Sequence, residues 1–240
     1  MLFVAHATCS AVCPTVKQGE HYSELIPFHG FKSNLIISVR LQMNNNTAWY
    51  LFPSTESTGE SCSNSWNKLW GATRCGYLAD VHEDSDRFMW RRAVSCLIFD
   101  DEGHEIGEKS NCSEANLIEI VAAAYDGGVR PYDRPGTLLK QFDTKLRVDT
   151  WYGLTLQFSE NQTIYQLFDD AGSILETQTI NHRICPKFNE GALLDLYFGG
   201  ICPAPQAVTV CYDQQNATSS TKSAVQLKNN KNRLVERLFR

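Results

Sequence analysis

The sequence predicts an all-β protein built as an antiparallel β-sandwich. Ten short segments rich in aliphatic and aromatic residues are each bounded by Asn, Asp, Gly or Pro, and few stretches show helical periodicity. Several of these segments alternate apolar and polar side chains, which is the pattern of a strand with one buried face and one solvated face. Many short strands at this spacing favour a sandwich.

The expected strands cover most of the chain. In 34–43, aliphatic side chains recur at every second position from Leu35 to Leu41, so they would share the buried face. The other expected strands are 48–52, 87–99, 116–125, 137–142, 151–158, 163–168, 174–180, 192–200 and 207–212. They place the sandwich in residues 25–212, with an N-terminal segment at 1–24 and a basic, flexible tail at 213–240.

Two turns repeat one motif. FDDEG at 99–103 and FDDAG at 168–172 each follow one strand-like run and precede another. Asp side chains hydrogen-bond the local backbone in turns, and Gly takes the positive φ that a hairpin turn requires. Both motifs therefore predict hairpins. We interpret the carboxylates of the first as a solvated turn and not as a catalytic cluster.

The charge is unevenly distributed along the chain. Of 22 Lys/Arg and 27 Asp/Glu in total, residues 222–240 hold six basic and one acidic, which leaves 16 basic and 26 acidic residues in 1–221. Nucleic-acid-binding domains carry a basic stripe on the folded domain itself. The acidic body therefore argues against a nucleic-acid partner.

The cysteines and glycosylation motifs indicate an extracellular protein. The nine cysteines are scattered, without CxxC pairs or zinc-like Cys/His spacing, which fits the disulfides of secreted domains. Because the count is odd, one cysteine is free or pairs with another chain. Asn-x-Ser/Thr motifs predict glycosylation at Asn45, Asn111, Asn161 and Asn216. We expect a secreted protein or one on the outer face of a cell membrane or virion.

The two ends of the chain carry weak targeting signals. The first fifteen residues are partly apolar but lack a basic start, so they are either a clipped signal peptide or a plain beginning. No segment approaches the roughly 18 consecutive apolar residues of a membrane span. At the other end, Arg237 and Arg240 match the Arg-x-x-Arg pattern of furin-like cleavage sites, with an ordinary basic tail as the alternative.

A long Ser-, Thr- and Gly-rich stretch at 53–76 reads as a binding loop. We expect a Cys62–Cys75 disulfide to staple it, and long ordered loops on rigid sandwiches often carry the binding function. Exposed indoles of Trp66 and Trp70 in this loop could stack on a sugar or anchor a protein partner. The alternative is that both fold inward, as we expect Trp90 to do.

A second candidate loop spans 125–136 and combines aromatic, acidic and basic side chains suited to hydrogen-bonding sugar hydroxyls. Its candidate ligand-binding residues are Tyr125, Asp126, Arg130, Tyr132 and Asp133. Internal Asp–Arg pairing is the alternative interpretation.

The acidic run DVHEDSDR at 80–87 is the candidate calcium site. Its hard oxygen ligands would be Asp80, Glu83, Asp84 and Asp86. The spacing does not match an EF-hand loop, and a solvated acidic loop is the alternative. No other cofactor is expected.

The stretch from 151 to 200 resembles the second half of a concanavalin-like or laminin-G-like jelly-roll sandwich. The residues that carry this resemblance are Trp151, Leu154, Leu156, Phe158, Tyr165, Phe168, Asp170, Gly172, Leu196, Phe198, Gly199 and Gly200, and 31–43 is similar to an early strand of the same fold. The resemblance implies a family that includes lectins, adhesion modules and glycan-cleaving enzymes. Fold alone does not choose among them.

Sequence motifs for catalysis are missing, so no catalytic residue is assigned. A retaining glycosidase on this fold would need two carboxylates on one strand face, whereas Glu119 and Asp195 each stand alone. We therefore expect a lectin-like or adhesion module that binds a glycan or a protein receptor. The alternatives are the amino-terminal attachment subunit of a cleaved viral or cell-surface glycoprotein, paired with a partner subunit, and a glycan-active hydrolase or lyase.

Overall fold

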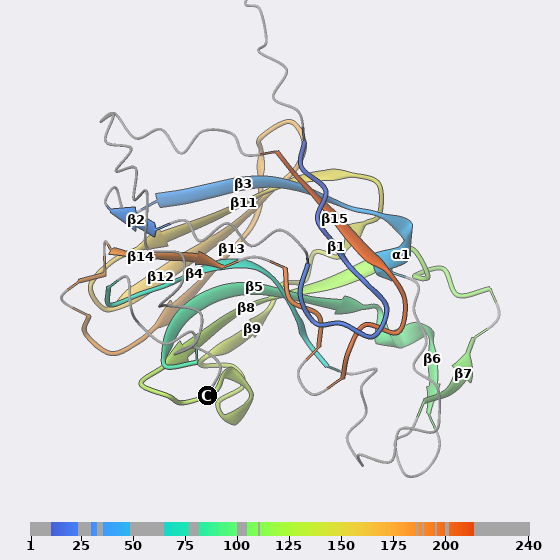
Figure 1. Cartoon of the computed structure of the whole chain (residues 1–240), viewed down its shortest axis with the longest axis horizontal. Helices are drawn as coiled ribbons and strands as arrows, with labels where there is room; N and C mark the ends of the chain where they lie inside the picture. Colours follow the sequence, from blue (N-terminus) through green and yellow to red (C-terminus); the bar gives the residue numbers. More distant parts are fainter. Residues whose placement is uncertain are drawn as a thin grey trace, which may run out of the picture.

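The protein folds as two antiparallel sheets packed face to face, which confirms the predicted β-sandwich. The computed structural model describes residues 11–23, 30–32, 36–48, 65–76, 82–99, 105–109, 111–185, 187–188, 190–194, 196–199 and 202–213. Figure 1 shows β3 (Ile36–Met43) and β11 (Trp151–Phe158) in the layer above β5 (Asp84–Arg92) and β8 (Leu117–Asp126). Each layer shields the apolar face of the other, as a sandwich requires.

The first sheet has six strands in the order β1-β15-β3-β11-β12-β13. Its remaining members are β1 (Thr15–Val16), β15 (Val208–Asp213), β12 (Gln162–Phe168) and β13 (Ile174–Asn181). Because β1 pairs with β15 and Cys13 is bonded to Cys211, part of the predicted N-terminal segment 1–24 lies within the sandwich. Residues 214–240 of the predicted tail lie outside the described part of the chain, as do Arg237 and Arg240.

The second sheet has seven strands, with β10-β8-β5-β4-β14-β2 in order and β9 paired beside β8. Its remaining members are β10 (Leu146–Arg147), β4 (Asn67–Thr73), β14 (Glu190–Leu194), β2 (Gly30–Lys32) and β9 (Leu139–Gln141). The shorter elements are the β6 (Leu97–Phe99)–β7 (Glu105–Glu108) ribbon, helix α1 (Asn45–Ala48) and 3-10 turns at Val94–Cys96 and Pro131–Asp133. This sheet carries the candidate site.

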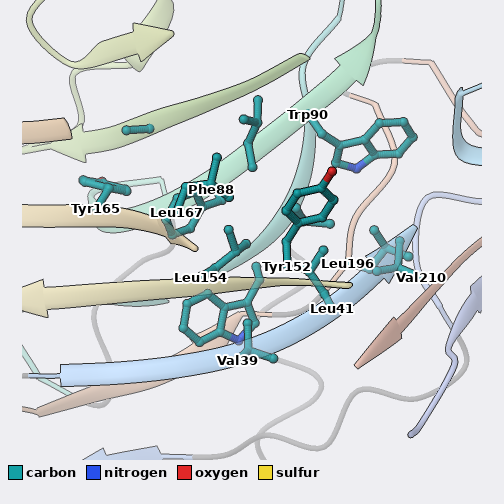
Figure 2. Close-up of a cluster of buried hydrophobic side chains, with 14 of the residues drawn as sticks. Val39, Leu41, Phe88, Trp90, Tyr152, Leu154, Tyr165, Leu167, Leu196 and Val210 are labelled. Carbon is teal, nitrogen blue, oxygen red and sulfur yellow. The ribbon is translucent and has the colours of Figure 1, made fainter. Parts of the chain in front are cut away.

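The core lies between the sheets and consists of alternate side chains from each strand. Val39 and Leu41 of β3 and Leu154 of β11 face Phe88 and Trp90 of β5 across the interface (Figure 2). Trp90 is fully buried, so it is a core residue and not a binding residue. The strict alternation read from 34–43 arises because side chains at i and i+2 share one face of a strand.

Both repeated motifs lie between paired antiparallel strands, as predicted. After β12, Asp169 accepts a hydrogen bond from the Ser173 backbone at 2.7 Å, and Gly172 adopts a φ of 85° before β13. The first motif joins β6 to β7, which are also antiparallel. The residues at 100–104, between those two strands, lie outside the described residues.

The predicted Cys62–Cys75 disulfide is wrong. Cys75 is bonded to Cys185, 110 positions away in the sequence, and Cys96 is bonded to Cys112. The physical reason is that Cys75, two residues after β4, lies beside Cys185 with a Cα–Cα distance of 5.3 Å, so the disulfide closes a long loop and not a local one. Cys62 lies outside the described residues.

The predicted loop 53–76 is partly strand. Residues 67–73 form β4, which pairs with β5 in the middle of the second sheet. Trp66 and Trp70 are only 8% and 6% exposed, so neither indole projects from the surface as the predicted exposed ring. Trp70 lies in the core against Phe88, at 6.4 Å between ring centroids. Residues 53–64 lie outside the described residues.

Candidate functional site

The outer face of the seven-stranded sheet carries the candidate site. Along β5, Phe88 and Trp90 point into the core, so the alternate residues Arg87, Met89 and Arg91 point outward. On the same outer face, Met89 packs with Trp66 and with Val121, Ala123 and Tyr125 of β8 into a second, smaller apolar cluster. The outer face of this sheet is therefore an apolar surface, which we call the floor, and it also carries cationic side chains.

A groove of about 510 Å³ lies at one end of this floor. It is lined by Trp66, Arg91, Val121, Pro135, Gly136, Leu139, Lys140, Gln141 and Gln178. Arg91 lies over the Trp66 ring at 4.2 Å from its centroid and donates from Nε to Glu119 Oε2 at 2.8 Å. The indole and the carboxylate together fix the guanidinium on the groove wall, where its remaining N–H groups are available as donors.

Amide groups line the opposite wall of the groove. Gln178 of β13 donates from Nε2 to the Gln141 backbone oxygen at 3.2 Å and to Glu176 Oε1 at 3.1 Å. These bonds tie the edge of the first sheet to β9 of the second. The held amide of Gln178 and the held guanidinium of Arg91, together with apolar side chains, are the composition of a small-molecule pocket, which combines apolar contact area with a few polar groups.

Two buried cations lie further along the same face. Arg87 is 7% exposed, no carboxylate of the described residues forms an ion pair with it, and its Nε atom is buried without a hydrogen-bond partner. Burial lowers the pKa of Arg87. Gly71 of β4 lies opposite Arg87, and a Cβ there would come within 2.7 Å of the Arg87 Cα and 2.9 Å of its Cγ. The glycine thus makes room for the arginine.

Lys68 is the second of these cations and is also 7% exposed. Its Nζ donates to the Gly199 carbonyl at 2.8 Å and lies 5.0 Å from the centroid of the Tyr197 ring. Burial, with a smaller contribution from the charge of Arg87, lowers the pKa of Lys68 to about 8. Two neighbouring cations thus share a poorly solvated region.

Four tyrosines lie close enough to Arg87 to influence its pKa: Tyr22, Tyr125, Tyr132 and Tyr197. Burial raises the pKa of Tyr125, Tyr132 and Tyr197, so these phenols keep their protons at neutral pH and can donate hydrogen bonds. Tyr22 packs edge-on against Tyr197 at 4.8 Å. We call Lys68, Arg87 and these four tyrosines the cation–tyrosine site.

The predicted loop at 125–136 contributes only in part. Tyr125 and Tyr132 belong to the cation–tyrosine site. Arg130 and Asp133 are exposed, as is Tyr132. Asp126 accepts hydrogen bonds from the Arg183 backbone N–H at 3.0 and 3.2 Å. Asp126 is therefore paired internally, although its partner is a remote arginine and not Arg130.

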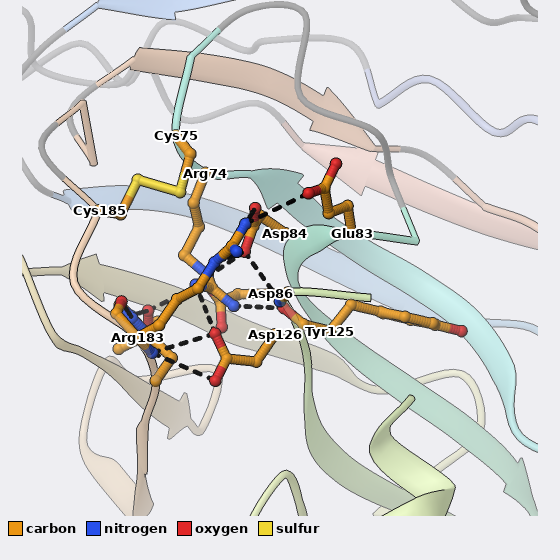
Figure 3. A network of polar contacts seen from close by, with 12 residues as sticks. Arg74, Cys75, Glu83, Asp84, Asp86, Tyr125, Asp126, Arg183 and Cys185 are labelled. Atoms are coloured by element: carbon orange, nitrogen blue, oxygen red, sulfur yellow. Dashed lines mark hydrogen bonds and ion pairs between the residues drawn. A yellow bond between two sulfur atoms is a disulfide. The ribbon is translucent and has the colours of Figure 1, made fainter. Parts of the chain in front are cut away.

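The predicted calcium ligands bind arginines. Figure 3 shows Arg74 and Arg183 among Asp84, Asp86 and Asp126, beside the Cys75–Cys185 disulfide. Arg74 Nε lies 2.6 Å from Asp86 Oδ2, and Arg183 pairs with Asp84. Glu83 lies 3.4 Å from Arg183, and Asp80 lies outside the described residues.

The calcium hypothesis therefore does not fit these residues. Asp84 and Asp86 alternate along β5 and point toward the sandwich interior, where Tyr165 and Thr163 also donate to Asp86. Their charge is neutralised by guanidinium groups, which leaves no free carboxylate set for a cation. Within the described ranges, no group of three or more His, Cys, Asp or Glu side chains could hold a metal ion.

The remaining predicted features concern the surface. Asn45, Asn111 and Asn161 are exposed, while Asn216 lies outside the described residues; glycosylation at these positions stays a prediction. The helices in the described part of the chain are too short and polar to span a membrane.

Sequence reasoning missed four residues of the cation–tyrosine site: Tyr22, Lys68, Arg87 and Tyr197. The sequence did contain a signal for Arg87. In RFMWRR the alternation places Arg87, Met89 and Arg91 on the face opposite Phe88 and Trp90. The other three come from separate segments that only the fold brings together. His82 extends this arrangement, with its ring 5.4 Å from that of Tyr125.

Comparison with known proteins finds distant fold similarity. No protein-family model matches the chain, and the search of curated proteins finds no match. A Saccharomyces cerevisiae protein of unknown function has a TM-score of 0.39 at 8% identity, over 85% of this chain and 89% of that one. A prokaryotic β-1,3-1,4-glucanase from a mouse hindgut metagenome has 0.37 at 8%, over 85% and 77%.

A third match is sheep galectin-11, with a TM-score of 0.29 at 11% identity, over 82% of this chain and 98% of that one. Similarity at this level carries no argument about activity, so function is argued from the side chains on the sheet.

Proposed function

We propose that the protein is an extracellular recognition module that binds a glycan along the outer face of its seven-stranded sheet. The observation that carries the proposal is the groove of about 510 Å³, which is lined by the held guanidinium of Arg91 and by the side chains of Gln141 and Gln178. Guanidinium and amide groups suit the hydroxyls of a sugar, and the apolar floor suits its C–H faces.

Binding is favoured over hydrolysis by the state of Glu119. This carboxylate lies beside the groove but is held by Arg91 at 2.8 Å and is 5% exposed. A buried carboxylate whose oxygen already accepts a hydrogen bond from an arginine is not free to approach a glycosidic bond. Two free carboxylates on one face, which a retaining glycosidase needs, are not found among the groove-lining residues.

The extracellular location is supported by the disulfides. The described residues contain the disulfides Cys13–Cys211, Cys75–Cys185 and Cys96–Cys112. Cys202 is also disulfide-bonded. Disulfides of this kind persist in oxidising compartments. The three exposed Asn-x-Ser/Thr acceptors are compatible with the same compartment.

The proposal is tested on a broad glycan array with the secreted protein. We expect selective binding that is lost in the double variant Gln141→Ala/Gln178→Ala. The matched control is Gln166→Ala on β12, a partly exposed glutamine of the other sheet. Absence of binding to every glycan, or equal binding by all three proteins, would overturn the proposed function and favour a protein-binding subunit.

A further inference from the structure

The outer face of the sheet holds a positive charge that the described part of the protein does not neutralise. Arg87 is buried, and its Nε atom lacks a hydrogen-bond partner. Unpaired buried charges are strongly disfavoured, and buried polar groups without partners are rare in native proteins. The arrangement therefore needs an explanation beyond packing.

The surroundings of Arg87 are built for a negative group. Lys68 adds a second cation, and its ammonium is bonded to the neutral carbonyl of Gly199 and not to a carboxylate. Protonated phenols of the surrounding tyrosines can donate but cannot neutralise charge. Tyr22 and Tyr132, 48% and 42% exposed, stand where solvent reaches the site.

The charge is also specific to this location. The body of the protein is acidic, yet the acidic residues nearest in the chain, Asp84 and Asp86, point toward the sandwich interior and bind Arg74 and Arg183. Glu119, on the same face as Arg87, is bound to Arg91. The described carboxylates closest to Arg87 along the chain and across the sheet thus bind other arginines, which leaves the cation–tyrosine site positive within the described residues.

We propose that the cation–tyrosine site binds the oxyanion of an acidic sugar, a uronate carboxylate or a sulfate ester, within a glycan that also occupies the groove. The inference rests on the proposed function, because it names the class of glycan bound on this face. The planar guanidinium of Arg87 suits a two-oxygen contact with carboxylate or sulfate. Lys68 supplies a second charge, and the tyrosine hydroxyls bond the remaining oxygens.

Strand geometry sets the size of the ligand. Arg91 in the groove and Arg87 in the cation–tyrosine site lie four residues apart on β5, which is about 13 Å along a strand at about 3.3 Å per residue. A single sugar could fill one site only. An oligosaccharide lying along the sheet would contact both, with its acidic group at Arg87.

Two pairs of soluble probes test the charge requirement by calorimetry. One pair is an oligogalacturonate and its carboxyl-reduced form, and the other is a sulfated galactan oligosaccharide and its desulfated form. We expect at least one acidic probe to bind at least tenfold more tightly than its neutral partner. The pair that shows the difference identifies the oxyanion as carboxylate or sulfate.

Variants test the location. Arg87→Met keeps the volume and removes the charge, so it should fold and should weaken the acidic probe at least tenfold while leaving neutral-probe binding unchanged. Lys68→Met is a second variant with the same expected direction. The matched control is Arg147→Met, which removes an exposed arginine from β10.

The outcomes separate this inference from the proposed function. Neutral and acidic probes that bind equally, or an acidic preference that survives both Arg87→Met and Lys68→Met, would overturn the oxyanion site while leaving the glycan-binding proposal intact. Loss of acidic-probe binding in Arg147→Met to the same extent would show nonspecific charge attraction and would also overturn the site. Failure of every glycan on the array overturns the proposed function itself.

Discussion

Replacement of Lys68 by methionine should change how stability depends on pH. Lys68 is buried beside Arg87, and its pKa falls from 10.5 to about 8. Above about pH 8 the folded protein releases this proton, whereas the unfolded chain keeps it until about pH 10.5. The free energy of unfolding of the wild-type protein therefore rises with pH in this window, because the unfolded state binds more protons.

The size of the effect follows from that pKa. A lowering of about 2.5 units corresponds to about 3.4 kcal/mol of penalty for the charged form at neutral pH. By proton linkage, about 2 kcal/mol of this penalty disappears between about pH 7 and about pH 9.5. Lys68→Met lacks the titrating group, so wild type should gain about 2 kcal/mol relative to the variant over this range.

Urea unfolding followed by tryptophan fluorescence gives both stabilities at each pH, with Trp90 as a buried reporter. At neutral pH the variant should be close to wild type in stability, because relief of the charge penalty is offset by the unsatisfied Gly199 carbonyl, worth about 1–3 kcal/mol. Lys109→Met, at an exposed lysine, is the control and should not reproduce the pH-dependent difference. A stability difference between wild type and Lys68→Met that stays constant with pH would refute the idea of a desolvated cation on this face.

Three further variants test the fold that supports the site. Arg74→Met should lower the free energy of unfolding by about 3–5 kcal/mol, measured by urea unfolding, because it leaves buried aspartates unpaired. Gly71→Ala should cost about 1–3 kcal/mol by the same assay, because the new Cβ would lie 2.1 Å from the Asp86 carbonyl oxygen. Cys75→Ser/Cys185→Ser opens a connection of 110 residues and should lower stability by about 2–5 kcal/mol in thermal unfolding. Stabilities equal to wild type would contradict the assigned contacts in each case.

Local patterns predicted the strands and hairpins because their causes are local. The alternation of 34–43 and the Asp-Asp-x-Gly turn at 169–172 depend on side-chain direction and on turn geometry within a few residues. The composition of 53–76 led to the wrong prediction of a loop throughout, because the pairing that makes part of it a strand is not local. Gly71, within this Gly-rich stretch, lies in β4, and a side chain there would collide with β5.

Partners remote in sequence could not be predicted from local patterns. The carboxylates at Asp84 and Asp86 indicated a cation, and the structure supplies one, but as guanidinium groups from Arg74 and Arg183. A single sequence does not distinguish calcium from an arginine that folding brings within reach. The same limit applies to Cys75, whose partner lies 110 positions away.

Arg74 and Arg87 are both buried in the same region of the sheet, but they differ in their carboxylate partners. Arg74 is fully buried on the interior side and lies within 4 Å of three aspartates: 2.6 Å from Asp86, and 3.8 Å from both Asp84 and Asp126. Arg87 is almost as buried on the outer side and has no carboxylate partner in the described part of the chain.

Packing alone would favour an apolar side chain at the second position, since well-packed hydrophobic residues commonly replace buried charges without loss of stability. The contrast is explained if Arg74 is neutralised by the protein and Arg87 by a ligand. An acidic ligand should then stabilise the wild-type protein against unfolding, in proportion to its concentration relative to Kd, and should not stabilise Arg87→Met. Equal stabilisation of both proteins would place the ligand elsewhere.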